Sequence, residues 1–451
     1  MIVRQIKNPL RAALLGTALL AFAAPAKAAQ DIAKRLAEAL AANDSAAVST
    51  LLAEDFKDQS EDFLGQGGLL LQLDQFRTAL PEAAVDYRVV KSPDGVIAIE
   101  RTLRGVATAP LFGEAPPPAP LTIKTMDFFT VKGGRIATRE GVVDTVGALQ
   151  QLTFPFPAPA PKQQSTVEEV VRFQPGQFPE GLIPGENGSV LLTMLFDNKI
   201  LSISADGAIT PYAELPFPSD PKTRQGTMCI ARAPDGAIFI TVHSKTPEAH
   251  GLWRLDPDGS ARNVAVLPQD AVPNGVDVDE KGRVYIADSS GGVWQWRPGE
   301  DNASKWLDAP IVNRRPFIGN LPGPNGLKVH KKWVYVAVSD TSSFVRIPIG
   351  KKGEAGEAEL VAHGAPGDDF DFDKDGAAYV TTHPFNSVLK VTDKGVESVI
   401  ANAEDGVVGP TSAAIVETDN GAALYVVTDG GLYAPVPGVD IVPRLVRIPL
   451  D

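Results

Sequence analysis

The C-terminal two thirds of the chain repeats one pattern, in which an oxygen-bearing side chain opens a strand-like segment. Copies begin at Glu180, Asn274, Asn325 and Asp368, and in three of these four a turn glycine follows eight residues later. The spacings between successive copies are 94, 51 and 43 residues, and the first equals two repeats of 47. Repeats of about 40–50 residues are typical of the four-stranded blades of a β-propeller.

Weaker copies bring the number of units to six. They begin near Glu180, Met228, Asn274, Asn325, Asp368 and Thr411. Each unit has a hairpin turn such as Pro234-Asp235-Gly236 and a second strand such as Val284–Ala287, with alternating apolar and polar residues. The repeats therefore predict an all-β six-bladed β-propeller over residues 166–451. Either residues 167–173 or Leu445–Ile448 should complete a blade and close the ring.

Equivalent positions of different blades should meet at one mouth of the central channel. Glu180, Asn274, Asn325 and Asp368 then bring carboxylate and amide oxygens together, without the soft donors of structural zinc or copper sites. This set predicts one divalent cation. Ca²⁺ is the first expectation, and Mg²⁺, Zn²⁺ and Mn²⁺ stay open. The alternative interpretation is that each Asn-Gly pair is an ordinary turn signal.

The loops that follow the second strands should return to the same mouth. They carry His243, Asp288, Asp340, His383 and Asp429. His383 or His243 is a candidate to protonate a leaving alkoxide, and either one is equally an ordinary loop residue. The Met228 and Thr411 positions bring no charged ligand, which leaves room for substrate. Asn274, His243, Asp369 and Thr411 are the predicted substrate-binding residues.

The segment from residue 29 to residue 153 has a different pattern, with helices before strands. Helical periodicity covers residues 31–52 and 69–80, and four strand-like stretches follow between residues 84 and 145. The polar candidates for a pocket are Asp127 and Asp144, with Arg101 as a partner. A carboxylate among apolar groups has a raised pKa and can move a proton. The alternative is a domain used only for packing or for binding a ligand, because the segment contains no histidine.

This segment resembles the SnoaL-like, polyketide-cyclase-like branch of the nuclear-transport-factor-like fold. The resemblance rests on Arg101-x-x-x-Gly105, Leu111-Phe112-Gly113, Met126-Asp127-Phe128-Phe129, the turn over 133–136 and the ending over 144–152. It implies an α+β cone with an apolar pocket, which some members use for acid/base chemistry and many use only to bind or to dimerise. A homodimer through this domain is one partner that the resemblance implies.

The two ends of the first domain are marked by composition. Three basic residues precede an apolar run over 12–24, and Ala26-Lys27-Ala28 supplies a small-x-small cleavage site, so residues 1–28 have the pattern of a secretory signal peptide. The apolar run is too short to span a bilayer. Alternate prolines over 154–161 predict an extended linker over residues 154–165. We expect a periplasmic or secreted protein, and an uncleaved anchor is the alternative.

The charge balance argues against nucleic acid and anionic membranes as partners. The first 28 residues contain four cations and no acid, which leaves 38 basic against 55 acidic side chains, a net charge of about −17. A phosphate-binding surface needs a basic patch, and no basic run occurs. The expected partner is a small molecule. The single cysteine, Cys229, cannot form an internal disulfide, so stability must come from buried core.

The repeats resemble the gluconolactonase, senescence-marker-protein and luciferin-regenerating-enzyme family. The motifs are Pro179-Glu180-Gly181, Pro273-Asn274-Gly275, Pro324-Asn325-Gly326, and Asp368 ahead of Asp373–Gly376. The resemblance implies that Glu180, Asn325 and Asp368 are metal ligands and that Asn274 is a ligand or a substrate contact. It also implies that Asp368 is the general base. The implied activity is metal-dependent hydrolysis of a lactone or a related ester.

Two residues depart from that family's pattern. Asp369 stands where glycine usually follows the aspartate, and Val272 stands where sugar-lactonase members carry an arginine. The second departure puts a sugar-acid lactone in doubt. Two alternatives stay open: a non-catalytic periplasmic binding or scaffold protein with a structural Ca²⁺, and a two-activity enzyme whose cone domain is an isomerase or cyclase. A serine nucleophile has no support, because the chain lacks a Gly-x-Ser-x-Gly motif.

Overall fold

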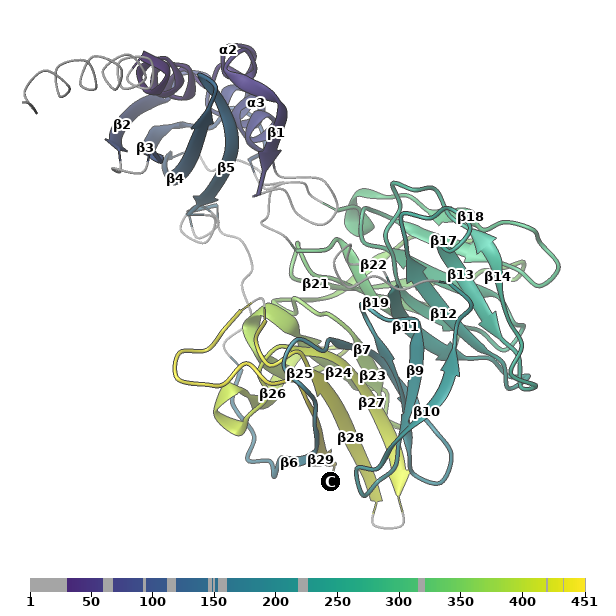
Figure 1. Ribbon diagram of the computed structural model, residues 1–451. Helices are drawn as coiled ribbons and strands as arrows, with labels where there is room; N and C mark the ends of the chain where they lie inside the picture. The colour runs from purple at the N-terminus through teal and green to yellow at the C-terminus, as the bar shows by residue number, and fades with distance from the viewer. Residues whose placement is uncertain are drawn as a thin grey trace, which may run out of the picture. The chain divides into compact units, whose positions relative to one another are not determined.

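The computed structural model describes most of the chain as two compact units (Figure 1). One unit holds residues 31–152 and the other holds residues 160–450. Within these bounds the described residues are 31–59, 68–91, 95–111, 119–144, 148, 151–152, 160–217, 226–314, 321–418, 421–432 and 434–450. The predicted signal peptide over 1–28, the motif residues 112–113, 145–147 and 149–150, and the linker residues 154–159 lie outside them.

The first unit is a five-stranded sheet with helices. Residues 31–41 are helical, and the other elements are α2 (Ser45–Ser49), β1 (Leu52–Asp58), α3 (Leu69–Ala79), β2 (Ala84–Lys91), β3 (Ile97–Val106), β4 (Pro120–Lys132) and β5 (Arg135–Val143). The strand order is β1-β5-β4-β3-β2, and β1 runs parallel to β5 while the other neighbours are antiparallel. Leu36, Leu40, Ile99 and Phe129 are among the side chains of its buried core.

Two details of this unit differ from the sequence prediction. The expected helix over 31–52 breaks near Asn43, whose φ is 48°, and Asp44 then caps α2 by accepting a hydrogen bond from Ala47 N at 2.9 Å. Asn and Asp favour such positions because their side chains bond the nearby backbone. Strand β1 was not predicted, because its side chains are partly or fully exposed and only its pairing with β5 makes it a strand.

A buried charge network crosses the inner face of this sheet. Arg101 Nη2 lies 3.2 Å from Asp127 Oδ2, and Arg139 Nη2 lies 2.7 Å from Asp127 Oδ1. Arg139 Nη1 lies 3.0 Å from Asp58 Oδ2. These four side chains are at most 2% exposed. Burial lowers the pKa of Arg101, and Asp127 opposes that shift. Asp127 is therefore shared between two guanidinium groups in the core of the unit.

The second unit consists, over its described residues, of six four-stranded sheets. In strand order they are β10-β9-β8-β7, β11-β12-β13-β14, β15-β16-β17-β18, β19-β20-β21-β22, β23-β24-β25-β26 and β27-β28-β29-β6, all antiparallel. The strands are β6 (Glu168–Arg172), β7 (Pro179–Pro184), β8 (Val190–Met194), β9 (Lys199–Ile203), β10 (Ile209–Glu214), β11 (Gly226–Arg232), β12 (Ile238–His243), β13 (Gly251–Leu255), β14 (Ala261–Val266), β15 (Pro273–Val278), β16 (Val284–Asp288), β17 (Val293–Trp296), β18 (Ser304–Leu307), β19 (Pro324–His330), β20 (Trp333–Val338), β21 (Ser343–Pro348), β22 (Glu359–His363), β23 (Phe370–Phe372), β24 (Ala378–Thr382), β25 (Ser387–Thr392), β26 (Gly395–Asn402), β27 (Pro410–Thr418), β28 (Gly421–Thr428) and β29 (Arg444–Pro449). Short 3₁₀ turns are η2 (Pro310–Val312), η3 (His383–Phe385) and η4 (Ala403–Asp405).

The six sheets follow one another around an axis and fit a β-propeller. Strands β7, β11, β15, β19, β23 and β27 each contact the next one, and β27 contacts β7. We call these the inner strands and the whole arrangement the sheet ring. Strand β6 pairs with β29 beside the C-terminus, so both segments that were candidates to close the ring take part in the last sheet (Figure 1).

Hydroxyl groups tie each sheet to the inner strand of the next. In five of these links the donor is a Thr or Ser on the second strand or directly after it. The bonds run from Thr193 Oγ1 to Met228 O, Thr241 Oγ1 to Asn274 O (2.5 Å), Ser289 Oγ to Pro324 O (3.0 Å), Ser339 Oγ to Gly367 O (2.6 Å) and Thr381 Oγ1 to Thr411 O (3.1 Å). Thr411 Oγ1 itself donates to Pro179 O at 2.9 Å and completes the circuit. The inner strands are thus held at matching depths.

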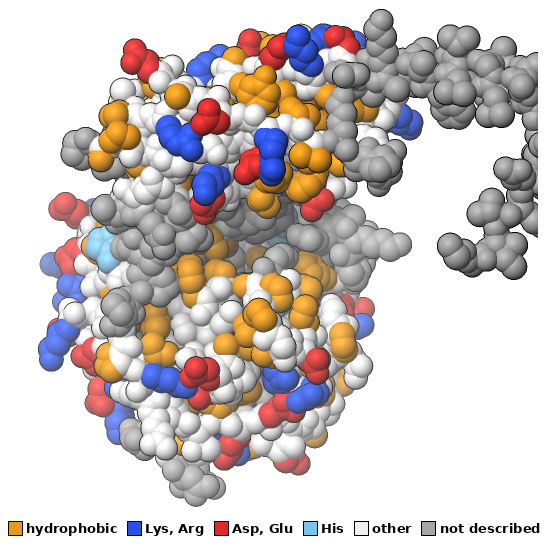
Figure 2. All heavy atoms as spheres, turned by 90° about the vertical axis from the view of Figure 1, so that its left-hand side faces the viewer, with side chains coloured by type: hydrophobic (Ala, Val, Ile, Leu, Met, Phe, Trp, Pro, Cys, Tyr) orange, Lys and Arg blue, Asp and Glu red, His pale blue; other side chains and the backbone are white. Residues whose placement is uncertain are grey.

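Charged surface side chains are mixed in sign on the face that Figure 2 presents, where acidic and basic groups lie side by side. Among the described residues, no helix is long and apolar enough to cross a membrane.

Replacing Asp127 with asparagine should destabilise the first unit strongly. The change leaves two buried arginines without their shared carboxylate, and breaking a buried ion pair in this way costs about 3–5 kcal/mol. Urea unfolding followed by circular dichroism measures the loss. Asp86→Asn is the matched control, because Asp86 pairs with Arg104 on the exposed side of the same sheet and should change stability little. Equal effects of the two changes would contradict the assignment.

The two units should fold independently, and the expected cut lies in residues 153–159, because Gln163 of the predicted linker over 154–165 already bonds Val399 in the second unit. Each unit has its own buried core, so brief digestion with a nonspecific protease should release two resistant fragments. Mass spectrometry of the fragments locates the cuts. Resistant fragments whose ends fall inside a sheet of either unit would contradict this boundary.

Candidate functional site

The inner strands bring the predicted site residues together at the end where these strands begin. Glu180 lies on β7, Asn274 on β15 and Asn325 on β19, and Asp368 and Asp369 directly precede β23. Their exposed fractions are only 3–7%. Buried carboxylates and amides need partners, so their hydrogen bonds decide what the group can do.

Glycine at two of these strand starts allows the inner strands to approach closely. A Cβ at Gly275 would lie 2.3 Å from Asn325 O, and a Cβ at Gly326 would lie 2.6 Å from Asp368 O. Neither glycine has a positive φ, so neither is present to make a turn. The alternative interpretation of the Asn-Gly pairs as turn signals is therefore wrong at these positions.

The amide of Asn325 has its orientation fixed by two acceptors. Its Nδ2 donates to Asp368 Oδ1 at 2.5 Å and to Ser339 Oγ at 3.2 Å. Ser339 gives its own proton to Gly367 O, so toward Asn325 it can only accept. The Asn325 Oδ1 atom must then face the other way, where it is buried without a hydrogen-bond partner among the described residues.

His383 is held between two carboxylates. Its Nδ1 lies 3.2 Å from Asp368 Oδ2, and its Nε2 lies 3.0 Å from Asp429 Oδ2. Asp429 is itself fixed by the backbone N–H groups of Gly431 and Leu432, at 2.6 and 3.1 Å. Burial opposes protonation of His383, but the hydrogen bonds to both carboxylates outweigh it and raise its pKa to about 10. The imidazole is therefore a cation at neutral pH.

The carboxylates at the strand starts repel one another. Burial, and then the charge of Asp368, raise the pKa of Glu180 well above its usual range, and Asp369 and Asp429 add to the shift. Burial also raises the pKa of Asp368, although its bond to His383 opposes the change. A cation placed among these oxygens would relieve the repulsion.

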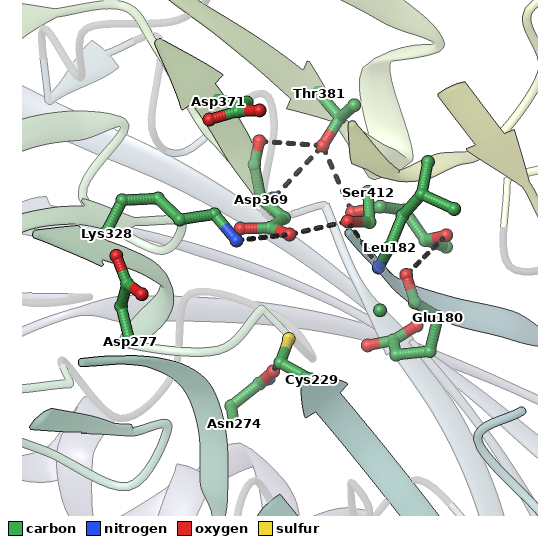
Figure 3. Close-up of polar contacts among 12 residues, drawn as sticks. Glu180, Leu182, Cys229, Asn274, Asp277, Lys328, Asp369, Asp371, Thr381 and Ser412 are labelled. Carbon is green, nitrogen blue, oxygen red and sulfur yellow. Dashed lines mark hydrogen bonds and ion pairs between the residues drawn. The ribbon is translucent and has the colours of Figure 1, made fainter. Parts of the chain in front are cut away.

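Asp369 points into the axis and contacts Lys328 and Ser412 (Figure 3). Its Oδ2 accepts a hydrogen bond from Ser412 Oγ at 2.5 Å and lies 3.7 Å from Lys328 Nζ. Ser412 Oγ in turn accepts from Leu182 N at 3.2 Å. The other oxygen, Asp369 Oδ1, is buried without a partner in the described part of the chain. This settles a side-chain direction that the sequence did not predict.

Asn274 and Thr411 are engaged mainly with neighbouring protein groups. Asn274 Nδ2 donates to Ser289 Oγ at 3.1 Å, and Asn274 Oδ1 accepts from the Cys229 thiol at 3.4 Å. Thr411 Oγ1 donates to Pro179 O. Both residues border the cluster, and their predicted roles as ligand or substrate contact stay predictions.

Among the other predicted residues, His243 ends β12 and Val272 directly precedes β15, and three others belong to the first unit. The His243 ring packs edge-on against His250 at 5.5 Å, and burial, followed by the charges of His250 and Lys245, lowers the pKa of His243 to about 4. Val272 is buried and donates its N–H to Asp288. In the first unit Arg101 and Asp127 belong to the buried charge network, whereas Asp144 is exposed.

The donor set fits an oxygen-liganded divalent cation. Glu180 and Asp368 supply carboxylates, and Asn325 Oδ1 supplies a buried amide oxygen to which no residue in the described part of the chain donates. The described residues contain no group of three or more His, Cys, Asp or Glu side chains placed to hold a metal by themselves. The set contains no sulfur ligand and is of the hard type.

Sequence reasoning missed a second layer of charge. Asp277, Lys328 and Asp371 each stand three residues after a site residue, on three neighbouring inner strands. That shared repeat position was a signal that could have found them. The repeats placed Asp429 and His383 at the same mouth, but they did not predict that the two side chains contact each other directly.

Comparison with a protein-family model identifies the first unit. Residues 30–152 match the family described as SnoaL-like polyketide cyclase. The N-terminal resemblance is confirmed.

Comparison with curated proteins finds a relative over part of the chain. The chain is 31% identical over 154 residues to Protein STRICTOSIDINE SYNTHASE-LIKE 3 of Arabidopsis thaliana. The match covers 31% of this chain and spans only 39% of that protein's length.

Solved structures similar to this chain include three of the types that the repeat motifs resemble. A luciferin-regenerating enzyme is 11% identical, with a TM-score of 0.46 over 64% of this chain and 96% of its own. A calcium-binding protein from Agrobacterium tumefaciens, regucalcin, is 16% identical, with a TM-score of 0.46 over the same shares. A protein described as a gluconolactonase is 16% identical, with a TM-score of 0.45 over 66% of this chain and 95% of its own.

Proposed function

We propose that the sheet ring is a six-bladed propeller and that its mouth is the active site of an exported, metal-dependent hydrolase that opens a lactone or a related ester. One observation carries the proposal. Asn325 Oδ1 is a buried amide oxygen that has no donor among the described residues. The Nδ2 of the same side chain donates a hydrogen bond to Asp368, which also contacts the cationic His383. Such a site offers a cation position, a base and an acid within one small cluster.

The ligands of the ion would be Glu180, Asn325 and Asp368, with Asn274 at the border of the set. Ca²⁺ is the first choice for these oxygens, ahead of Mg²⁺, Zn²⁺ and Mn²⁺. When bound, the ion supplies a Lewis acid that polarises the ester carbonyl.

Two side chains would handle protons. Asp368 accepts a proton from the attacking water at its carboxylate, and His383 delivers the proton on Nδ1 to the leaving alkoxide. Asp429 holds the opposite ring nitrogen, Nε2, and so keeps Nδ1 turned toward Asp368.

The alternative function is a non-catalytic binding or scaffold protein with a structural Ca²⁺. It is favoured by the fact that both Asp368 oxygens already accept hydrogen bonds, from Asn325 and from His383. A second activity in the first unit draws no similar support, since Asp127 is committed to two arginines. A homodimer through that unit remains part of the proposal, because its sheet exposes Tyr87, Phe128 and Val142.

Replacement of Asp368 by asparagine should distinguish the hydrolase function from the scaffold function. The amide keeps an oxygen for the ion but cannot accept a proton, so kcat should fall by about 10²–10⁴ while the ion still binds. Glu180→Gln should mainly weaken ion binding, so an excess of Ca²⁺ should restore part of its activity. The measurements are ester hydrolysis and calorimetric titration with Ca²⁺.

His363→Gln is the control for these two variants, because His363 is exposed at the end of β22 and away from the cluster. Wild-type hydrolysis by ion-loaded Asp368→Asn would rule out the base assignment. A wild-type protein that hydrolyses no lactone or ester with Ca²⁺, Mg²⁺, Mn²⁺ or Zn²⁺ would favour the scaffold.

Substrate preference should lean toward less polar lactones. Val272 is a buried apolar residue where a sugar-lactone site would need a cationic partner for hydroxyls, and each buried hydroxyl left unpaired costs about 1–3 kcal/mol. We therefore expect kcat/KM for aliphatic or aromatic lactones to exceed that for gluconolactone by tenfold or more. A clear preference for gluconolactone in the same assay would contradict this expectation.

A further inference from the structure

The loops at the mouth differ in polarity between two halves of the sheet ring. We number the sheets along the chain, so that the first contains β7 and the sixth contains β27. In the first, fifth and sixth sheets the loop after the second strand carries a large apolar side chain, namely Phe196, Phe385 and Leu432. In the second, third and fourth sheets the same loop carries polar side chains, namely Ser244-Lys245, Ser289-Ser290 and Ser339-Asp340-Thr341. Strand β27 contacts both β24 and β7, so the three sheets with apolar loops are neighbours and share one side of the mouth.

Phe178 connects this side of the mouth to His383. The Phe178 ring lies edge-on to the His383 imidazole, with 5.9 Å between the ring centroids and 78° between the planes. Phe178 also packs against Phe196, with 5.5 Å between the centroids. The backbone N–H of Leu195 donates to Phe178 O at 2.8 Å, which ties the segment before β7 to the loop after β8. Aromatic side chains of the first sheet therefore lie beside the imidazole.

Leu432 adds apolar surface from the sixth sheet. Asp429 Oδ2 lies 3.0 Å from His383 Nε2 and accepts a hydrogen bond from Leu432 N at 3.1 Å, so the histidine and the leucine share one carboxylate oxygen. Leu432 is 43% exposed, whereas Phe178 is 3% exposed. An exposed leucine whose backbone is fixed beside buried polar groups is available to contact a ligand. We call Phe178, Phe196 and Leu432 the apolar flank.

The position of His383 determines which part of an ester meets the apolar flank. In the proposed hydrolysis the bond between the acyl carbon and the alkoxide oxygen breaks. Water supplies its oxygen to the acyl carbon and a proton to Asp368, and His383 gives a proton to the alkoxide oxygen. This transfer requires the alkoxide oxygen to lie within hydrogen-bond reach of the imidazole. The carbon bonded to that oxygen, together with its substituents, must then lie beside His383.

We propose that the apolar flank binds an alkyl or aryl group on the alcohol side of the substrate. The preferred substrates are then lactones that carry such a group on the carbon bonded to the ring oxygen, and esters of apolar alcohols. The acyl side faces the other half of the mouth, where the loops carry hydroxyl and charged groups. The inference rests on the proposed function for the placement of the alkoxide beside His383. It goes further than the expectation from Val272, because it says where on the substrate the apolar group lies.

Two isomeric lactones test the inference, because they differ only in the place of a butyl group. γ-Octalactone carries the butyl group on the carbon bonded to the ring oxygen, and α-butyl-γ-butyrolactone carries it on the carbon next to the carbonyl. The measurement is kcat/KM of the full chain with Ca²⁺ for each lactone. The value for γ-octalactone should be higher by about tenfold or more, because each methylene that is buried contributes about fourfold.

Variants of Leu432 connect this ratio of kcat/KM values to the apolar flank. Leu432→Gln should lower the ratio by about threefold or more, because a polar side chain then replaces apolar surface. Leu432→Met keeps an apolar side chain and should retain the wild-type ratio. Leu360→Gln is the matched control, because Leu360 is also 43% exposed but lies on β22, the outermost strand of the fourth sheet. A loss of stability alone would change both kcat/KM values equally and leave the ratio unchanged.

The outcomes separate this inference from the proposed function. If the wild type hydrolyses both lactones equally, or prefers the α-butyl isomer, the hydrolase stands and the inference is overturned. It is also overturned if Leu432→Gln and Leu360→Gln give the same ratio. If the wild type hydrolyses neither lactone, the failure concerns the proposed function, and both lactones then serve as stable ligands for titration calorimetry. Tighter binding of γ-octalactone that is lost in Leu432→Gln would support the apolar flank, and equal or undetectable binding would overturn it.

Discussion

The hydroxyl bonds between neighbouring sheets are the interaction on which the rest of the second unit depends. Each one joins a Thr or Ser to a carbonyl on the next inner strand, or directly before it, and each lies in a buried environment. One such bond contributes only about 0.5–1.5 kcal/mol, but leaving its carbonyl unpaired would cost more. Because the donors recur at one place in five sheets, they set the relative depth of the inner strands. Residues that are far apart in the sequence then meet at one level of the axis.

Because these residues converge, buried carboxylates repel one another along the axis, and two cationic side chains of the protein offset that repulsion. Burial raises the pKa of four carboxylates along the axis. They are Glu180, Asp277, Asp368 and Asp371, and Asp369 and Asp429 lie near them. His383 lies beside Asp368 at the strand starts, and Lys328 lies beside Asp369 in the second layer of charge. The two cations are held in different ways. His383 is hydrogen-bonded on both nitrogens and fixed in orientation, whereas the contact given for the Lys328 ammonium within the described part of the chain is its ion pair with Asp369 at 3.7 Å. The fixed orientation of His383 suits a group that transfers a proton in one direction. The position of Lys328 suits a group that only balances charge.

The sequence predicted those parts of the molecule that depend on local pattern. The starts of the six repeats fall at or beside the inner strands, and the register of Glu180, Asn325 and Asp368 follows from counting along the repeat. It placed His383 and Asp429 at one mouth and named Arg101 as a partner for Asp127, but it could not predict that His383 contacts Asp429 directly or that Arg139 shares Asp127. It also missed β1, whose pairing with a distant strand outweighs its weak local pattern. The direction of Asp369 depended on Ser412 and Lys328, which lie on two other strands.

The Asn325-Gly326 pair fits either a turn or a strand start until its neighbours in space are known. An aspartate at 325 would place a carboxylate against Asp368 Oδ1, and a leucine would leave Ser339 and Asp368 without their donor. Asparagine alone donates to both acceptors and still presents an oxygen on its other side. Gly326 is required because its Cα faces the backbone of Asp368 and Asp369, where a side chain has no room. The pair therefore follows from the packing of two inner strands, and the free amide oxygen follows from the same packing. The cation position that we propose at the mouth would thus be a consequence of how closely the strands approach.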